Sequence, residues 1–195
     1  MDVRFLFISL FLFLGEGPLS ETPDFPNQIL LTKNNLVYIL DKTGSVEKNE
    51  LYSIAHYLQG AIEEQEKVIF VHIFTDGEVK EFLIEWKKNF TSQELQEEFA
   101  TSFEKALNHS EYQDNLSTIE TFLHFFDHDV KSGEQTKIFW MANGDLQVFY
   151  GSTLKGKIKS IPFAKAVWKI WLGKNSVVQK TLLIDSYIRT TDTID

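Results

Sequence analysis

Residues 161–175 read IPFAKAVWKIWLGKN, and they carry the clearest structural signal in the chain. Pro162 suits the first turn of a helix, where its missing N–H has no partner, and Gly173 suits the helix end. The apolar side chains between them recur with the period of an amphipathic helix. They are Phe163, Val167, Ile170 and Trp171. The pattern predicts a helix over 161–172 that packs its aromatic side against a sheet.

The residues before this helix alternate with the period of two that is typical of strands. Residues 136–141 and 146–150 flank Asn143-Gly144-Asp145, and Asn and Gly tolerate the positive φ of a tight hairpin turn. Residues 151–160 supply a third strand. The segment therefore predicts antiparallel β-structure that leads directly into the helix.

The middle of the chain contains three helical patterns. In residues 79–90 the apolar stripe includes Phe82 and Trp86, while Lys80 and Glu81 lie off it. Thr91-Ser92-Gln93-Glu94 has the form of a capping box and begins a second helix. The third pattern covers residues 116–126.

The N-terminal half predicts strands. Residues 28–31 and 36–40 are short apolar runs that suggest a hairpin, and residues 51–58 and 68–74 have the pattern of strands. The polar residues 41–50 predict a loop, and a last short helix is expected over 176–183. This order of elements indicates one α+β domain over residues 28–184.

The two ends lie outside the expected domain. Residues 1–20 join Arg4 to the apolar run FLFISLFLFL and to small, turn-prone residues, as in a secretory signal peptide. Ten apolar residues are too few for a membrane span, which needs about 20; an N-terminal strand or anchor is the alternative. Residues 21–27 predict a linker and residues 185–195 a polar tail. We expect a periplasmic or secreted protein with no stable membrane span after signal removal.

Composition excludes several classes of function. The 195 residues carry a net charge of −9, so phosphate repulsion argues against non-specific nucleic-acid binding. Cysteine is absent, which excludes disulfides, thiolate metal sites and a cysteine nucleophile. The sequence has no Walker loop, dinucleotide fingerprint or nucleophile elbow. No cofactor is predicted.

The histidines give a weak metal pattern. His124 and His128 are spaced to share one helix face and lie beside Asp127, but the general-base glutamate of a zinc-protease motif is missing. A helix C-terminus, where the dipole favours a cationic histidine, is the favoured interpretation, and no metal site is predicted. His56 and His72 are interpreted as hydrogen-bonded residues rather than bases.

Aromatic side chains are abundant, with 17 Phe and 4 Trp. This number of large aromatic side chains predicts either a large aromatic core or an apolar cleft between helices and sheet that is open to a flat or lipidic ligand.

Several segments also resemble a known family. Asn143-Gly144-Asp145, Phe149-Tyr150-Gly151 and residues 162–175 follow one another as in the C-terminal part of chalcone isomerase-like proteins. Residues 51–58, 74–90 and 129–134 are similar to the early strand, the strand–turn–helix segment and a later turn of that family. The resemblance covers roughly residues 28–183 and is to the bacterial exported branch in particular.

The resemblance implies an open-faced sandwich, in which helices cover one face of an antiparallel sheet above a ligand cleft. It also implies flavonoid or fatty-acid ligands, and in the enzymes a cofactor-free ring closure with a cation on the developing enolate. Where the enzymes have a catalytic Arg, residues 41–46 offer only Lys42, which lacks the bidentate guanidinium fork. Tyr52 and Ile170 replace further polar residues of the enzymes.

The favoured prediction is an exported, non-catalytic domain that binds an apolar or amphiphilic, fatty-acid-like molecule. The expected ligand contacts are Lys42, Tyr52, Trp86, Trp168, Ile170 and Trp171. One alternative is a cofactor-free isomerase (an intramolecular lyase) that uses Lys42 or Tyr52 on the enolate. The other is a partner-binding module whose cleft is filled by its own side chains.

Overall fold

The computed structural model of the chain describes residues 24–33, 36–61 and 65–188. These residues form a seven-stranded sheet in which each strand pairs antiparallel with its neighbour in the sequence. The strands are β1 Gln28–Lys33, β2 Leu36–Lys48, β3 Tyr52–Gln59, β4 Lys80–Trp86, β5 Gln135–Trp140, β6 Asp145–Tyr150 and β7 Thr153–Lys159. The expected antiparallel sheet is confirmed.

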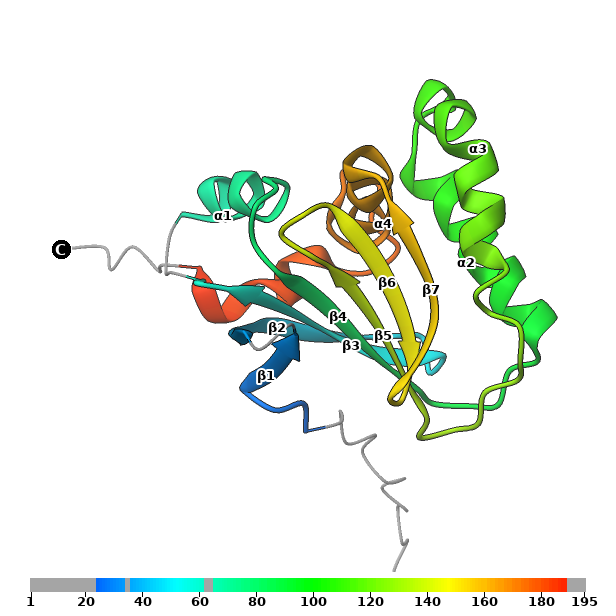
Figure 1. The fold of residues 1–195 in the computed structure, drawn as a ribbon, viewed down its shortest axis with the longest axis horizontal. Helices are drawn as coiled ribbons and strands as arrows, with labels where there is room; N and C mark the ends of the chain where they lie inside the picture. Colours follow the sequence, from blue (N-terminus) through cyan, green and yellow to red (C-terminus); the bar gives the residue numbers. More distant parts are fainter. Residues whose placement is uncertain (1–23, 34–35, 62–64, 189–195) are drawn as a thin grey trace, which may run out of the picture.

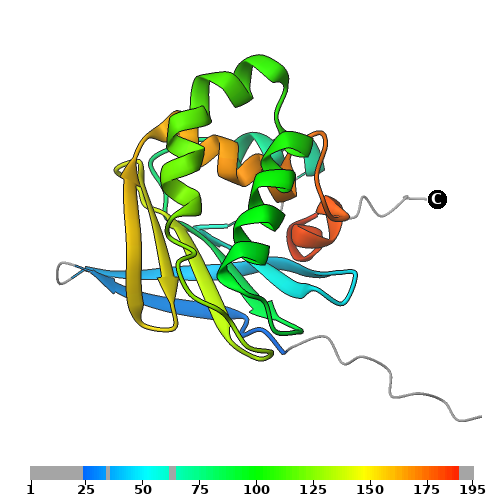
Figure 2. The same ribbon diagram turned by 90° about the vertical axis from the view of Figure 1, so that its right-hand side faces the viewer.

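Helices cover one face of this sheet, as Figures 1 and 2 show. They are α1 Glu66–Ile73, α2 Ser92–Ala106, α3 His109–Leu123, α4 Ile161–Leu172 and the 3-10 turns η1 Lys180–Leu183 and η2 Asp185–Tyr187. Helix α1 lies apart from the group formed by α2, α3 and α4 (Figure 1). The predicted open-faced α+β sandwich is confirmed.

Successive side chains of each strand point to opposite faces of the sheet. On β3, Tyr52, Ile54 and Leu58 belong to the large core beneath the helices. Ala55 and Tyr57 belong to a smaller apolar cluster on the opposite face. Because both faces are covered at β3, seven of its eight residues are buried.

Two elements differ from the sequence prediction. The run at 68–74, predicted as a strand, is helix α1, because a short continuous apolar run is equally compatible with a buried strand and a helix. The helix predicted over 79–90 is strand β4. Phe82 and Trp86 point to the helix-side core and Leu83 to the opposite cluster. Because apolar residues are buried on both faces of β4, their spacing in the sequence resembles that of an amphipathic helix.

The loop predicted over 41–50 is also wrong, because β2 continues to Lys48. A bulge between Lys42 and Gly44 adds one residue to the strand, and Thr43 thereby reaches His56 on the helix side. A Cβ at Gly44 would clash with the backbone of Leu182 and Leu183. Glycine at this position therefore lets η1 pack directly on the strand.

The local capping and turn signals are confirmed. The Glu94 backbone N–H donates to Thr91 Oγ1 (3.2 Å), and the Thr91 N–H donates to the Glu94 carboxylate (2.8 Å), which begins α2. Gly144 adopts φ 83° in the β5–β6 hairpin.

Helix α4 spans the predicted residues, whereas the third helix begins earlier than predicted, at His109. Of the helix expected over 176–183, only η1 forms.

The predicted signal peptide lies outside the described residues, as do residues 189–195 of the predicted tail. Phe25, in the segment predicted as a linker, is buried in the apolar cluster on the face away from the helices. None of the described helices has the length and apolar character needed to cross a bilayer.

Candidate functional site

The aromatic residues predicted to line a cleft pack against one another beneath the helices. Trp171 Nε1 donates to Tyr52 Oη (2.9 Å), and Trp86 lies edge-on to the Tyr52 ring with a centroid distance of 5.5 Å. Trp86 Nε1 in turn donates to Thr136 Oγ1 (2.9 Å). Only 3% of Tyr52 is exposed, and burial raises its pKa far above the ordinary value. These residues, predicted as ligand contacts in a cleft, are part of the packed core.

Trp168 occupies a second part of the same core. Its Nε1–H donates to His56 Nε2 (3.2 Å), which leaves the His56 proton on Nδ1, 2.7 Å from Thr43 Oγ1. The Thr43 hydroxyl donates to the Leu183 carbonyl oxygen (2.6 Å). Burial, with a smaller contribution from the charge of Lys80, lowers the pKa of His56 to about 3. His56 is thus a hydrogen-bonded residue, as the sequence interpretation favoured, and it lies in the interior.

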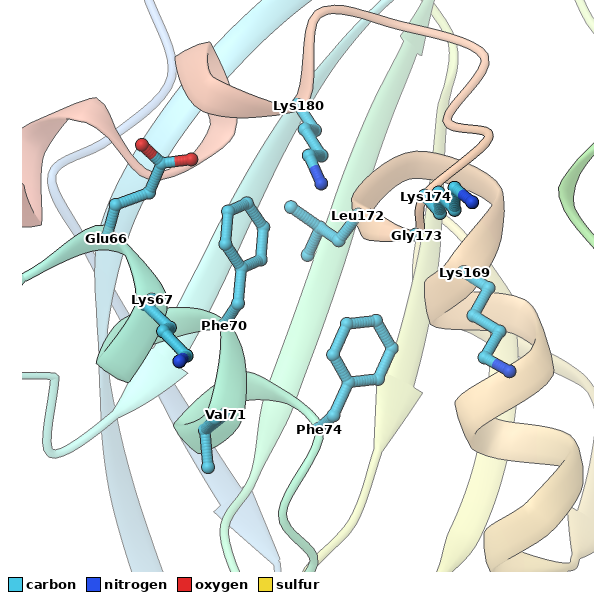
Figure 3. Close-up of a pocket in the computed structure, with 10 residues that line it drawn as sticks. All are labelled: Glu66, Lys67, Phe70, Val71, Phe74, Lys169, Leu172, Gly173, Lys174 and Lys180. Carbon is cyan, nitrogen blue, oxygen red and sulfur yellow. The ribbon is translucent and has the colours of Figure 1, made fainter.

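A pocket of about 770 Å³ opens between α1 and the C-terminal end of α4. Phe70, Phe74 and Leu172 face one another across it, and the Lys180 side chain enters from η1 (Figure 3). Its volume lies within the range of about 300–1,000 Å³ that is usual for small-molecule sites. The remaining lining residues are Glu66, Lys67, Val71, Lys169, Gly173 and Lys174. The pocket combines an apolar floor with a basic rim.

Two smaller spaces adjoin this α1–α4 pocket. A groove of about 410 Å³ shares Phe74 and Lys169 with it and continues along α4 past Leu107 and Ala166. A small, partly open space of about 60 Å³ lies beneath α1, between Ile69 and Leu58 of β3. Helix α1 therefore has empty space on two sides.

The chalcone isomerase-like family matches residues 24–183 of the chain. The chain belongs to this family. Among solved structures, a fatty-acid binding protein of Arabidopsis thaliana aligns with a TM-score of 0.60 and 8% sequence identity, over 82% of this chain and 97% of that chain. At this identity the likeness shows a shared fold alone. No curated protein matches the sequence.

Lys42 and Tyr52, the two candidates for enolate stabilisation in this chalcone isomerase-like chain, lie on opposite faces of the sheet. Lys42 is the cross-strand partner of Tyr57, and its Nζ donates to the Phe25 carbonyl oxygen (2.8 Å) on the face away from the helices. Tyr52 is part of the helix-side core. The ammonium near the Tyr52 ring is that of Lys48, which is ion-paired with Glu98. A single cleft cannot be lined by both Lys42 and Tyr52.

Ile170 completes the set of predicted contacts. It is fully buried in the helix-side core of α4, with Trp168 and Trp171. None of the six predicted residues lines the α1–α4 pocket. The sequence signal for the pocket was the apolar run at 68–74, which points to a ligand surface only when it is interpreted as a helix.

The histidine pattern at residues 124–128 forms a surface ion-pair cluster. His128 Nδ1 lies 2.9 Å from an Asp127 carboxylate oxygen, which Lys155 Nζ approaches to 2.7 Å. These two hydrogen bonds lower the pKa of Asp127 to about 2. His124 is the C-cap of α3, as the helix-end interpretation expected. Within the described part of the chain, no group of three or more His, Asp or Glu side chains is arranged to hold a metal ion.

Proposed function

We propose that this chalcone isomerase-like protein is a non-catalytic carrier or sensor of a fatty-acid-like molecule, which it binds in the α1–α4 pocket. The observation that carries the proposal is the apolar floor of Phe70, Phe74 and Leu172 in a pocket of small-molecule size. The Arabidopsis protein of the same fold is a fatty-acid binding protein, which supports the same class of ligand. The site lies within the helix layer, beside α4 rather than beneath it.

A Val71→Glu variant tests the site. Val71 lines the pocket and is 64% exposed, so a glutamate there is tolerated by the fold but places a charge beside the ligand tail. We expect the full-length variant to bind dodecanoate about tenfold more weakly than the wild type, which corresponds to about 1.4 kcal/mol. Isothermal titration calorimetry measures both affinities.

Val37→Glu is the matched control, because Val37 is 62% exposed on β2 and does not line the pocket. It should bind dodecanoate as the wild type does. The proposal fails if the wild type does not bind dodecanoate at micromolar to millimolar concentrations, or if both glutamate variants weaken binding equally.

The packed interior supports a second candidate function. Trp168, Trp171 and Tyr52 fill the space between α4 and the sheet, as expected of a partner-binding module whose cleft is occupied by its own side chains. Under that function the wild type binds no dodecanoate, so the same titration separates the two candidates.

We also propose export of the protein to the periplasm or the medium, as in the exported bacterial branch of the family. The support is the sequence of residues 1–20, with Arg4 before a ten-residue apolar run. Intact-mass spectrometry of the protein from fractionated cells should find it in the periplasm or medium without about 20 N-terminal residues. Recovery of the uncleaved chain from the cytoplasm would contradict export.

A further inference from the structure

Basic side chains gather around the α1–α4 pocket of an otherwise acidic protein. Its rim carries four lysines, from α1, α4, η1 and the turn after α4, against one carboxylate, that of Glu66. The lysines are Lys67, Lys169, Lys174 and Lys180. The whole chain has a net charge of −9, so this local excess is opposite in sign to the molecule. A positively charged rim beside an apolar floor concentrates anions at the pocket.

Most of this positive charge has no carboxylate partner among the residues that the structure describes. Lys169 is ion-paired with Glu111 of α3. Among the described residues, no carboxylate lies within ion-pair distance of Lys67, Lys174 or Lys180. Lys180 Nζ instead lies over the Phe70 ring, 4.5 Å from its centroid. An incoming anion can therefore pair with Lys67, Lys174 or Lys180 without displacing a carboxylate of the described residues.

Lys180 marks the end of the pocket at which the anion would lie. Its side chain points between Phe70 and Leu172, with Lys174 beyond Leu172 (Figure 3). Away from Lys180 the lining leads to Phe74, where the α1–α4 pocket meets the groove along α4. An amphiphile with its charged end at Lys180 can lay its chain over Phe70 and Phe74, and each buried methylene contributes about 0.8 kcal/mol.

We propose that the α1–α4 pocket selects single-chain carboxylates over neutral and cationic chains, with Lys180 and Lys174 binding the carboxylate and the chain directed towards Phe74. This inference rests on the proposed function, because it assigns the head-group chemistry of the same site. A lysine ammonium attracts a carboxylate as a point charge and repels an amine, whereas a neutral alcohol gains little from it. Lys180 and Lys174 are thus specificity-determining residues.

The test compares dodecanoate, dodecanol and dodecylamine on the full-length protein by calorimetry. The wild type should bind dodecanoate at least tenfold more tightly than dodecanol, and dodecylamine most weakly. Lys180→Met keeps an unbranched apolar side chain and removes the charge. It should weaken dodecanoate binding about tenfold and change dodecanol binding less than twofold. Lys174→Met should act in the same direction, and added salt should weaken only dodecanoate binding.

Lys105→Met is the control, because Lys105 is exposed on α2, away from the pocket, and carries the same charge. It should leave all three affinities unchanged. Equal binding of dodecanoate and dodecanol to the wild type overturns the head-group assignment and leaves the proposed function intact. Equal loss of both ligands in Lys180→Met also overturns it, because Lys180 then acts by packing on Phe70. Failure of every ligand to bind overturns the proposed function itself.

Discussion

Trp168→Ala should lower the free energy of unfolding by about 3–5 kcal/mol, the usual cost of truncating a buried aromatic residue. Trp168 is fully buried on α4, where its ring lies 4.8 Å from the centroid of Phe82 and 5.4 Å from that of Trp140. Alanine leaves a cavity at this junction of helix and sheet. It also removes the N–H that His56 Nε2 accepts. Urea unfolding of the variant and the wild type measures the loss.

Trp168→Phe separates the two contributions. It keeps most of the ring contacts but leaves the buried His56 Nε2 without a donor, so we expect a loss of about 1–3 kcal/mol. Leu154→Ala is the surface control, because Leu154 is 50% exposed on β7 and its truncation should change stability by less than about 0.5 kcal/mol. If Trp168→Ala costs no more than Leu154→Ala, Trp168 is not a core residue.

The elements that were predicted correctly are marked by capping and turn residues that lie within a few positions of one another. Thr91 and Glu94 cap α2 through their own backbone N–H groups, and Gly144 supplies the positive φ of its hairpin. Pro162 lies in the first turn of α4, where its missing N–H costs nothing. Such features depend on local backbone chemistry and so are visible in one sequence.

The elements that were missed depend on contacts made far along the chain. Strand β4 is covered by helices on one face and by Phe25 and its neighbours on the other. Its hydrophobic residues therefore do not alternate, and its pattern resembled a helix. Helix α1 was missed because the short, mostly apolar run at 68–74 has no period that distinguishes a helix from a strand.

The candidate site was missed for a related reason. Tyr52, Trp168 and Trp171 were predicted as ligand contacts in a cleft and lie in the helix-side core, because a sequence cannot show whether large side chains line a cleft or fill it. The α1–α4 pocket joins Phe70 to Leu172 and Lys180, which are about a hundred residues further along the chain. Lys42 was predicted at the cleft from the family resemblance, as the only residue that could replace the catalytic Arg, whereas β2 directs its side chain to the opposite face.

Glu81 shows most clearly what the change from helix to strand implies. The helical interpretation of residues 79–90 placed Glu81 off the apolar stripe, whereas β4 buries it completely. It lies between its cross-strand partners Tyr57 and Phe139, on the face away from the helices. Neither carboxylate oxygen has a hydrogen-bond partner within the described part of the chain. Burial raises the pKa of Glu81 to about 8, although the charge of Lys137 opposes the rise.

Glu81→Gln should stabilise the protein increasingly as the pH rises. Glu81 has an ordinary pKa of 4.5 and a folded-state pKa of about 8, so between these values the folded state binds more protons than the unfolded state. The contribution of Glu81 to stability is present below pH 4.5 and is lost as the pH rises towards 8. Glutamine is neutral throughout. Since one pKa unit corresponds to about 1.4 kcal/mol, its advantage over the wild type should grow by on the order of 4 kcal/mol across this range.

Urea unfolding of both proteins between pH 5 and pH 8 measures this difference. The buried His56 contributes an opposite trend, because its lowered pKa makes stability rise with pH up to its ordinary value of 6.5. Both proteins contain His56, so its effect cancels in the comparison. Glu104→Gln, on the exposed surface of α2, should show no pH-dependent gain. A constant difference between Glu81→Gln and the wild type at every pH would mean that Glu81 is ionised in the folded protein, and hence reached by water or by a cation.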